Sequence, residues 1–269
     1  MAGHIALDTA GPHPGLAFVT LSHPGKLNAM SRAMWRELRA VFEQVQRSGG
    51  IRCVVIRGEA GQFCAGGDIA EYPGFRFEEA GLRDFHERDV WGGLQALLDC
   101  DVPLVAQIEG ACMGAGVEIA SCCDIRIAAE SARFGAPIAR LGFPMAPREA
   151  QLVMRAAGEL TAREMLLEAA VLDAAEMKAR GFLHRVVDEG QAAEQALQAA
   201  RRVAALAPQA ARLNKQTFRA LNRPEVQVHG SSAAMDLIAN AYRYADSDEH
   251  REGIQAFIEK RTPRFLTPP

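Results

Sequence analysis

The sequence predicts an α/β protein with one large core, residues 1–188, followed by a helical C-terminal region, residues 189–269. Two observations support this division. Short apolar runs of strand length alternate with amphipathic helical patterns through the first part of the chain. From Arg148 onward the composition changes to alanine-rich helical patterns, and no linker is long enough to make the last part independent.

Clear boundary signals mark the first strand, helix and strand. Residues 16–21 form an apolar strand that ends at the turn sequence Ser-His-Pro-Gly. Ser31 is expected to cap a helix whose apolar residues recur at helical spacing until Gly49 and Gly50 end it. Residues 53–56 then predict a short buried strand that leads into a loop.

The middle of the chain predicts two further strands around a helix. Residues 104–108 form a strand, residues 117–123 the first turns of a buried helix, and residues 124–128 an alternating strand. Residues 72–90 show no clean period, so either a mobile flap or short helices are expected there. A helix follows at residues 94–98.

The remaining chain is predicted to be mainly helical after a loop rich in glycine and proline, residues 132–147. Thr161 is expected to cap a helix that runs through Ala170. Asp173 is expected to cap another, which is followed by a short strand at residues 184–187. Helical patterns complete the chain at residues 191–206, 208–221, 233–244 and 247–260.

Composition and charge argue against several classes of protein. The 269 residues are 49% hydrophobic and 23% charged, which is typical of a folded domain. A formal net charge of −3 argues against nucleic acid or an anionic membrane as a partner, and no apolar run has the length of a membrane span. The six cysteines lack metal-ligand spacing and suit reduced, buried thiols, so no metal site is expected. A cytoplasmic protein is the expectation.

The chain is organised around residues 108–124, where a single acid stands within an apolar run that contains three glycines. The glycines permit sharp bends, and Glu118 falls in the first turn of the helix that follows. Two interpretations of Glu118 remain open: a desolvated acid at a functional site, or a partly solvated acid favoured by the helix dipole. A dinucleotide-binding fingerprint is excluded because Ile119 occupies the third glycine position.

A second glycine-rich turn lies at residues 62–69, after a strand and a loop. By itself it is compatible with an ordinary tight corner. If its backbone N–H groups point at the same oxygen as those near Glu118, the two turns form an oxyanion hole with a carboxyl group beside it. Such a site stabilises the enolate that forms when a proton leaves the carbon next to a thioester carbonyl.

These segments resemble those of a known family. Residues 63–69, Phe-Cys-Ala-Gly-Gly-Asp-Ile, and residues 108–119 are similar to the two oxyanion-hole motifs of the crotonase (enoyl-CoA hydratase/isomerase) superfamily. Residues 22–30 resemble its coenzyme A-binding turn, residues 123–128 the strand that follows, and residues 252–261 its C-terminal helix. The resemblance implies a crotonase-type spiral of ββα units with a helical C-terminal trimerisation part.

The resemblance also implies roles for particular residues. The amides of Ala65 and Ala115 would form the oxyanion hole, and Glu118 would be the catalytic acid or base. Coenzyme A is expected as part of an acyl-CoA substrate, with no permanently bound cofactor. The positions implied to line its path are Lys26, Leu27, Ala29, Ala65, Gly66, Gly67, Asp68, Ile69 and Met113. Phe257 and Lys260 are implied to meet the coenzyme A of a neighbouring subunit in a homotrimer or a dimer of trimers.

One position departs from the family pattern. Ile138 follows the proline of the Phe-Gly-Ala-Pro segment, where the hydratase pattern has its second glutamate. A single glutamate can still hydrate an enoyl-CoA or shift its double bond. The alternatives are other enolate chemistry, as in a decarboxylase or thioester hydrolase, and a non-catalytic relative that binds acyl-CoA or RNA. The flap, residues 72–91, is expected to cover Ile138 and to shape the acyl pocket.

Four further side chains have less specific expectations. His86 stands among acidic residues and is expected on the surface. Glu149 is expected to begin a helix as an acid that compensates the helix dipole. Arg140 either pairs with a second carboxylate of the substrate or faces solvent. Cys64, beside the second glycine turn, is expected to serve packing.

Overall fold

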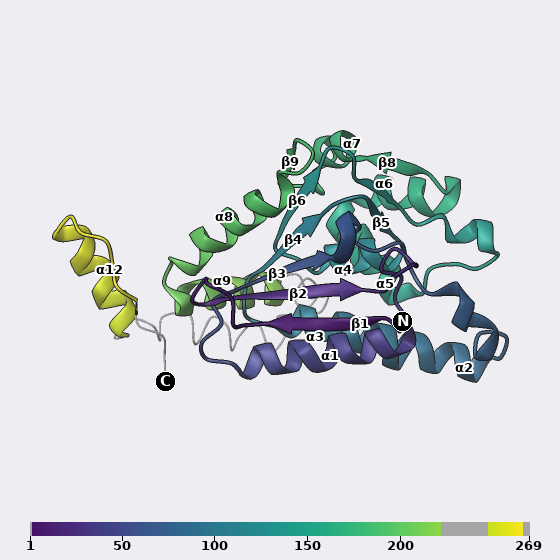
Figure 1. Cartoon of the computed structure of the whole chain (residues 1–269), viewed down its shortest axis with the longest axis horizontal. Coiled ribbons are helices and arrows are strands. Elements are labelled where there is room, and N and C mark those ends of the chain that lie inside the picture. The colour runs from purple at the N-terminus through teal and green to yellow at the C-terminus, as the bar shows by residue number, and fades with distance from the viewer. Residues whose placement is uncertain (1, 222–246, 266–269) are drawn as a thin grey trace.

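A six-stranded sheet forms the centre of the fold, with the strand order β1-β2-β3-β4-β6-β9 (Figure 1). β1 pairs antiparallel with β2, and each later pair of neighbours is parallel. The strands are β1 (His4–Asp8), β2 (Leu16–Ser22), β3 (Cys53–Gly58), β4 (Leu104–Ile108), β6 (Ile125–Ala129) and β9 (Arg185–Val187). The structure, a computed structural model, describes residues 2–221 and 247–265.

A second, three-stranded sheet stands beside the first. It consists of β5 (Ala111–Met113), β7 (Arg133–Gly135) and β8 (Val171–Asp173), in the order β5-β7-β8. β7 falls within residues 132–147, where the sequence predicts a loop. A strand of three residues is too short to show a period of two, so the glycine- and proline-rich sequence around β7 favours a loop instead.

Helices cover both faces of the main sheet (Figure 1). On β3, Val54 and Ile56 belong to the core under α1 and α3, whereas Cys53 and Val55 belong to the core under α8, as the alternation of side chains along a strand requires. The helices are α1 (Arg32–Arg47), α2 (Glu79–Asp84), α3 (Trp91–Asp99), α4 (Ala115–Ser121), α5 (Pro147–Ala157), α6 (Glu159–Arg163), α7 (Ala174–Ala179), α8 (Ala192–Ala204), α9 (Pro208–Leu221) and α12 (Asp248–Ile258). Short helical turns lie at Glu59–Gly61, Ile69–Gly74, Phe85–Val90, Pro137–Leu141 and Glu164–Glu168.

Ser31 caps α1, as the sequence predicts. Its side-chain oxygen accepts a hydrogen bond from the N–H of Met34 at 3.2 Å. We expect Ser31→Ala to lower the free energy of unfolding by about 1 kcal/mol, because the Met34 amide loses its acceptor at a buried helix start. Urea denaturation measures the change. Ser48→Ala, at the other end of α1, is the control, and an equal loss in both variants would contradict the capping role.

One predicted helix boundary is wrong. Thr161 does not cap a helix but is buried inside α6, which begins at Glu159. The chain breaks earlier, at Gly158, whose φ of 86° is a left-handed conformation that glycine adopts readily. In contrast, Asp173 caps α7 as expected, by accepting a hydrogen bond from the Glu176 N–H at 2.8 Å. A strong capping residue is thus overridden when a nearby glycine supplies the break.

The C-terminal region is joined to the core rather than independent of it. α8 packs Ala196, Ala199 and Ala200 against the main sheet. α12 lies at the far end of the molecule (Figure 1) and reaches α9 through Glu249, which accepts a hydrogen bond from the Gln209 N–H at 2.8 Å. The helix predicted at residues 233–244 lies outside the described residues.

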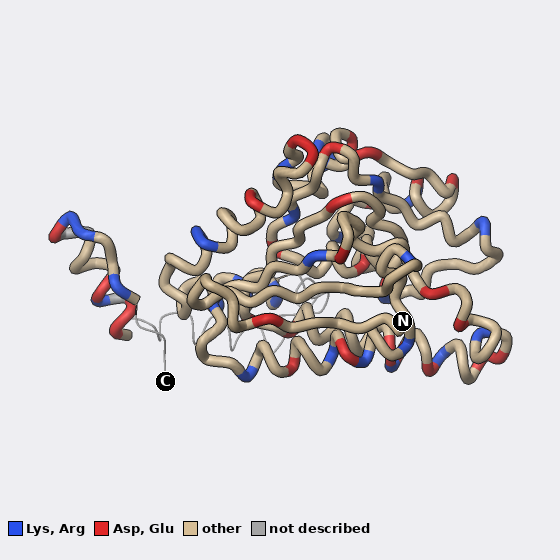
Figure 2. The backbone as a smooth tube through the Cα atoms, in the orientation of Figure 1, with Lys and Arg blue, Asp and Glu red and all other residues tan. Residues whose placement is uncertain are grey.

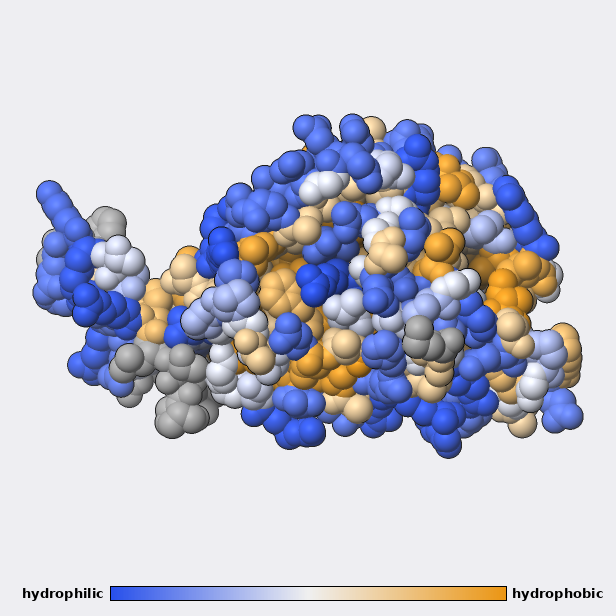
Figure 3. Space-filling model, in the orientation of Figure 1, coloured by the Kyte–Doolittle hydropathy of each residue, from blue (hydrophilic) through white to orange (hydrophobic). Residues whose placement is uncertain are grey.

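The surface mixes charges of both signs along its helices, for example on α1 and α12 (Figure 2). Hydrophobic surface shows at the β8 and α6 side of the molecule (Figure 3), where Leu160, Leu167 and Val171 are exposed. Within residues 2–221 and 247–265, no helix has the length and apolar character of a membrane span. The six cysteines are buried and free.

Candidate active site

The two glycine-rich turns lie against each other. The Cys64 N–H donates to the Ala111 carbonyl, and the Met113 N–H donates to the Cys64 carbonyl, each at 2.8 Å. A methyl group placed on Gly114 would lie 3.7 Å from the Cα atom of Gly66, which shows how closely the turns approach. The fold therefore brings together the two segments on which the oxyanion-hole prediction depends.

This approach requires glycine at three positions. Gly66 and Gly114 have φ angles of 115° and 47°, which side chains of L-amino acids disfavour. A methyl group on Gly116 would lie 2.6 Å from the carbonyl oxygen of Cys64 and 3.1 Å from its Cβ atom. Any residue larger than glycine at position 116 must therefore push the two turns apart.

The structure corrects one of the predicted donors. The Ala65 N–H donates to the Leu27 carbonyl at 3.0 Å, so it is already bound within the protein. In the described part of the chain, the Gly67 N–H makes no hydrogen bond, and Gly67 lines the same pocket. Ala115 begins α4, and the first amides of a helix have no partner within it. Among the residues that the structure describes, Gly67 and Ala115 therefore each have an unbonded amide in the lining of the pocket.

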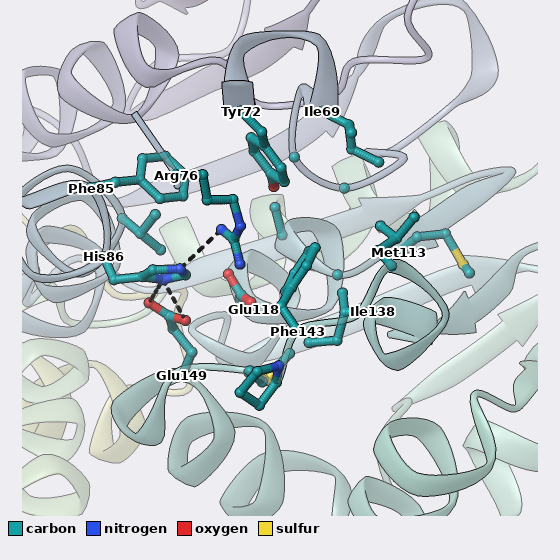
Figure 4. A pocket seen from close by; sticks show the side chains of 18 of the residues that line it. Ile69, Tyr72, Arg76, Phe85, His86, Met113, Glu118, Ile138, Phe143 and Glu149 are labelled. Atoms are coloured by element: carbon teal, nitrogen blue, oxygen red, sulfur yellow. Dashed lines mark hydrogen bonds and ion pairs between the residues drawn. The ribbon is translucent and has the colours of Figure 1, made fainter. Parts of the chain in front are cut away.

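A pocket of about 300 Å³ opens where the turns meet (Figure 4). Tyr72 and Phe85 form one part of its wall and Ile138 and Phe143 another. The flap expected at residues 72–91 consists mainly of short helices and lines this pocket together with Ile138, which is half buried. The pocket thus combines largely apolar walls with a small number of polar groups, as ligand sites commonly do.

Glu118 lies at the centre of this pocket and is only 7% exposed (Figure 4). Burial raises the pKa of Glu118 well above its usual range, and the negative charge of Glu149 raises it further. Of the two interpretations of this residue, the desolvated acid is therefore correct. A carboxyl group in such surroundings retains its proton to a higher pH than one in water.

One residue of this site contradicts its prediction, and another has a position beyond what was predicted. Glu149 lies in the first turn of α5, as predicted for an acid at a helix start, but it is also 2% exposed and lines the pocket. His86, expected on the surface, is mostly buried, and its Nδ1 atom lies 3.0 and 3.1 Å from the two carboxylate oxygens of Glu149 (Figure 4). The two residues are 63 positions apart, so no local pattern could show that they meet.

Arg76 determines which ring nitrogen of His86 donates and which accepts a hydrogen bond. Its Nη1 atom lies 3.2 Å from His86 Nε2 (Figure 4). A guanidinium group can only donate, so Nε2 accepts, and the remaining ring proton is on Nδ1, which donates to Glu149. The guanidinium also lies over the rings of Phe143 and Tyr72, 3.7 and 4.6 Å from their centroids. His86 thus connects a cation that lies on aromatic rings with a buried carboxylate.

Tyr72 lies directly beside the free amide of Gly67. A methyl group on Gly67 would lie 2.1 Å from the Tyr72 hydroxyl oxygen, so only glycine leaves room for it. Burial raises the pKa of Tyr72 to about 12, so the hydroxyl remains a hydrogen-bond donor at neutral pH. The Tyr72 ring packs edge-on against Phe75, Phe85 and Phe143.

The residues predicted to line the coenzyme A path gather beside the pocket. Lys26 Nζ lies 2.6 Å from Asp68 Oδ2. Leu27 and Ile69 are 54% and 51% exposed, whereas Ala29 is buried. The fold therefore assembles the predicted set, and its contact with coenzyme A stays a prediction.

Other expected site residues are placed as follows. Lys260 is exposed just after α12, and Phe257 belongs to α12 with its side chain outside the described part of the structure. Their contact with a neighbouring subunit, and the trimer itself, stay predictions.

Arg140 lines the pocket and donates to the Ala169 carbonyl at 3.0 Å. Burial raises the pKa of Cys64 to about 12, which suits the packing role. The described residues contain no group of side chains suited to a metal ion.

Comparisons with known proteins show the family of this chain. The enoyl-CoA hydratase/isomerase family matches residues 12–268. A probable enoyl-CoA hydratase of Rhizobium meliloti is 31% identical over 250 residues, which are 93% of this chain and 94% of that one. The 2,3-dehydroadipyl-CoA hydratase of Escherichia coli is 32% identical over 247 residues, 92% and 93% of the two chains.

Solved structures show the same fold. The crystal structure of an enoyl-CoA hydratase/carnithine racemase from Magnetospirillum magneticum has a TM-score of 0.90 and 34% identity, and covers 98% of this chain and 96% of that one. The fold and the paired glycine turns define a crotonase-type protein. The chain belongs to the enoyl-CoA hydratase/isomerase family, which implies an acyl-CoA substrate.

Proposed function

We propose that the protein is an enzyme that adds water to the double bond of a 2-enoyl-CoA thioester, with Glu118 as its acid. The observation that carries the proposal is the buried Glu118 carboxyl in the pocket where the Gly67 and Ala115 amides are unbonded. Two amides and one acid suit a reaction that builds negative charge on an oxygen and then protonates the adjacent carbon. Hydratase names among the relatives favour hydration over isomerisation.

The groups divide the reaction as follows. The thioester oxygen accepts hydrogen bonds from the Gly67 and Ala115 amides. Water adds to C3, the electrons of the double bond move toward the thioester oxygen, and the resulting enolate receives a proton at C2 from Glu118. The added water loses one O–H proton, and a proton returns to the Glu118 carboxylate before the next turnover. The amides bind the oxygen more strongly as its charge grows, and one such donor typically lowers the barrier by about 2.7–4 kcal/mol. The apolar pocket walls strengthen these interactions because they exclude bulk water.

Absorbance separates hydration from its alternatives, because a conjugated enoyl thioester absorbs ultraviolet light that its hydrated product does not. We expect crotonyl-CoA to lose this absorbance and to gain one water by mass spectrometry. A gain of absorbance from a 3-enoyl-CoA, with crotonyl-CoA unchanged, would instead show isomerisation. Release of free coenzyme A thiol would show hydrolysis. Binding of acyl-CoA without any turnover would indicate a non-catalytic relative.

A further inference from the structure

Two buried carboxyl groups share the pocket. Glu118 comes from α4 and Glu149 from α5, and they are 7% and 2% exposed. Both line the same cavity, and the charge of Glu149 acts on Glu118. Two carboxyl groups this close in an apolar site resist ionising together, so one keeps a proton while the other is charged.

The surrounding groups decide which carboxyl is charged. The groups that face Glu149 are His86, Arg76, Tyr72 and Glu118. His86 donates its Nδ1 proton to the Glu149 carboxylate, while Arg76 occupies the other ring nitrogen. A hydrogen bond donated to a carboxylate favours its charged form. The negative charge therefore resides on Glu149 and the proton on Glu118.

We propose that Glu149 is a second catalytic residue, which takes a proton from the attacking water while Glu118 gives one to the substrate. His86 is its positioning residue. This inference rests on the hydration proposed above and assigns the other half of that reaction. The position that the sequence suggests for a second acid holds Ile138, on a different part of the pocket wall (Figure 4). The second carboxyl reaches the site from the start of α5 instead.

The proton balance of the step is complete. One O–H bond of water breaks, and its proton passes to the Glu149 carboxylate. The water oxygen bonds to C3, the electrons of the double bond move onto the thioester oxygen, and the C2–H bond forms with the proton of Glu118. Glu149 is then protonated and Glu118 charged. A proton returns from Glu149 to Glu118 through solvent water before the next turnover, so no other reactant is consumed.

The test compares Glu149→Gln with a matched control, Glu87→Gln. Glu87 is adjacent to His86 in the chain, but its carboxylate pairs with Arg148 at 3.1 Å and is half exposed. We expect Glu149→Gln to lower kcat for crotonyl-CoA by about 10²-fold with KM within about threefold, because glutamine cannot accept the proton of water. Glu87→Gln should match the unmodified protein. A Glu149→Gln variant with unchanged kcat would overturn the inference.

Chemical rescue distinguishes the loss of the Glu149 carboxylate from a purely structural effect of the substitution. Glu149→Ala leaves space beside His86, and we expect added formate to restore part of its kcat, since formate supplies a carboxylate there. His86→Gln should lower kcat for crotonyl-CoA with little change in KM, because the Glu149 carboxylate loses the ring that holds it in place. An unchanged kcat in His86→Gln, together with no rescue by formate, would overturn the assignment.

Failure of the hydration proposal would be visible separately, as absence of crotonyl-CoA turnover in the unmodified protein. In that case the assignment of Glu149, which rests on hydration, fails together with the hydration proposal. Turnover of crotonyl-CoA by the unmodified protein with an unchanged kcat in Glu149→Gln would instead overturn the assignment of Glu149 alone.

Discussion

Replacing Glu118 with glutamine should lower kcat for crotonyl-CoA by about 10³-fold, while a saturated acyl-CoA binds with almost the same Kd. Glutamine has nearly the same shape but no proton to give to C2. The side chain is 7% exposed, so bulk water cannot easily replace it as a proton donor. Steady-state kinetics of the two proteins, together with calorimetric titration of butyryl-CoA, measure the two quantities.

The same substitution should affect stability in the opposite direction. Because the folded state raises the pKa of Glu118, it holds a proton that the unfolded chain releases above the usual glutamate pKa. The unmodified protein therefore loses stability as pH rises through that interval, and Glu118→Gln should lose less. Urea denaturation at several pH values tests this.

A variant that is both inactive and destabilised at alkaline pH would instead point to misfolding. Glu109→Gln, whose carboxylate binds Gln107, is a control from a neighbouring segment.

Replacing Gly116 with alanine should lower kcat/KM by about 10²- to 10³-fold. This loss is expected even though the new methyl group does not contact the polar groups that line the pocket. The methyl group would meet the Cys64 carbonyl at 2.6 Å, a contact that only a shift of backbone relieves. That shift separates the turn that carries Gly67 from the helix start that carries Ala115. One of the two amides then no longer reaches the thioester oxygen.

The control for this prediction is Gly50→Ala. A methyl group at Gly50 would have no atom within 4 Å, so the substitution should leave kcat/KM unchanged. Circular dichroism and thermal denaturation would show whether Gly116→Ala remains folded. A folded Gly116→Ala protein with full activity would mean that the distance between the turns does not limit the reaction.

Local signals in the sequence were sufficient for the helix caps and for the central acid. Ser31 and Asp173 cap their helices because capping depends on residues within one turn. Glu118 was identifiable as a candidate because apolar neighbours surround it along the chain. The prediction that Thr161 caps a helix is wrong because the start of that helix depends on Gly158, three residues earlier.

The rest of the site depends on contacts between distant segments. The choice between the Ala65 and Gly67 amides is made by Leu27, whose carbonyl occupies the first of them. The pairing of His86 with Glu149 joins a flap to a helix start 63 positions away, and the acidic neighbours of His86 in the chain indicate solvent exposure for it. A sequence motif therefore indicates which segment forms the site. Which backbone amides of that segment are left without a hydrogen bond depends on contacts made in the fold.

The glycine at position 67 leaves room for an aromatic side chain beside the backbone of the turn. The Tyr72 hydroxyl occupies the space that a methyl group on Gly67 would fill, so the aromatic lining of the pocket lies directly against this turn. If the pocket holds the acyl group as proposed, an acyl group that displaces the Tyr72 ring would also press on the backbone at Gly67. We therefore expect a substitution at Tyr72 that changes the substrate range to lower turnover as well.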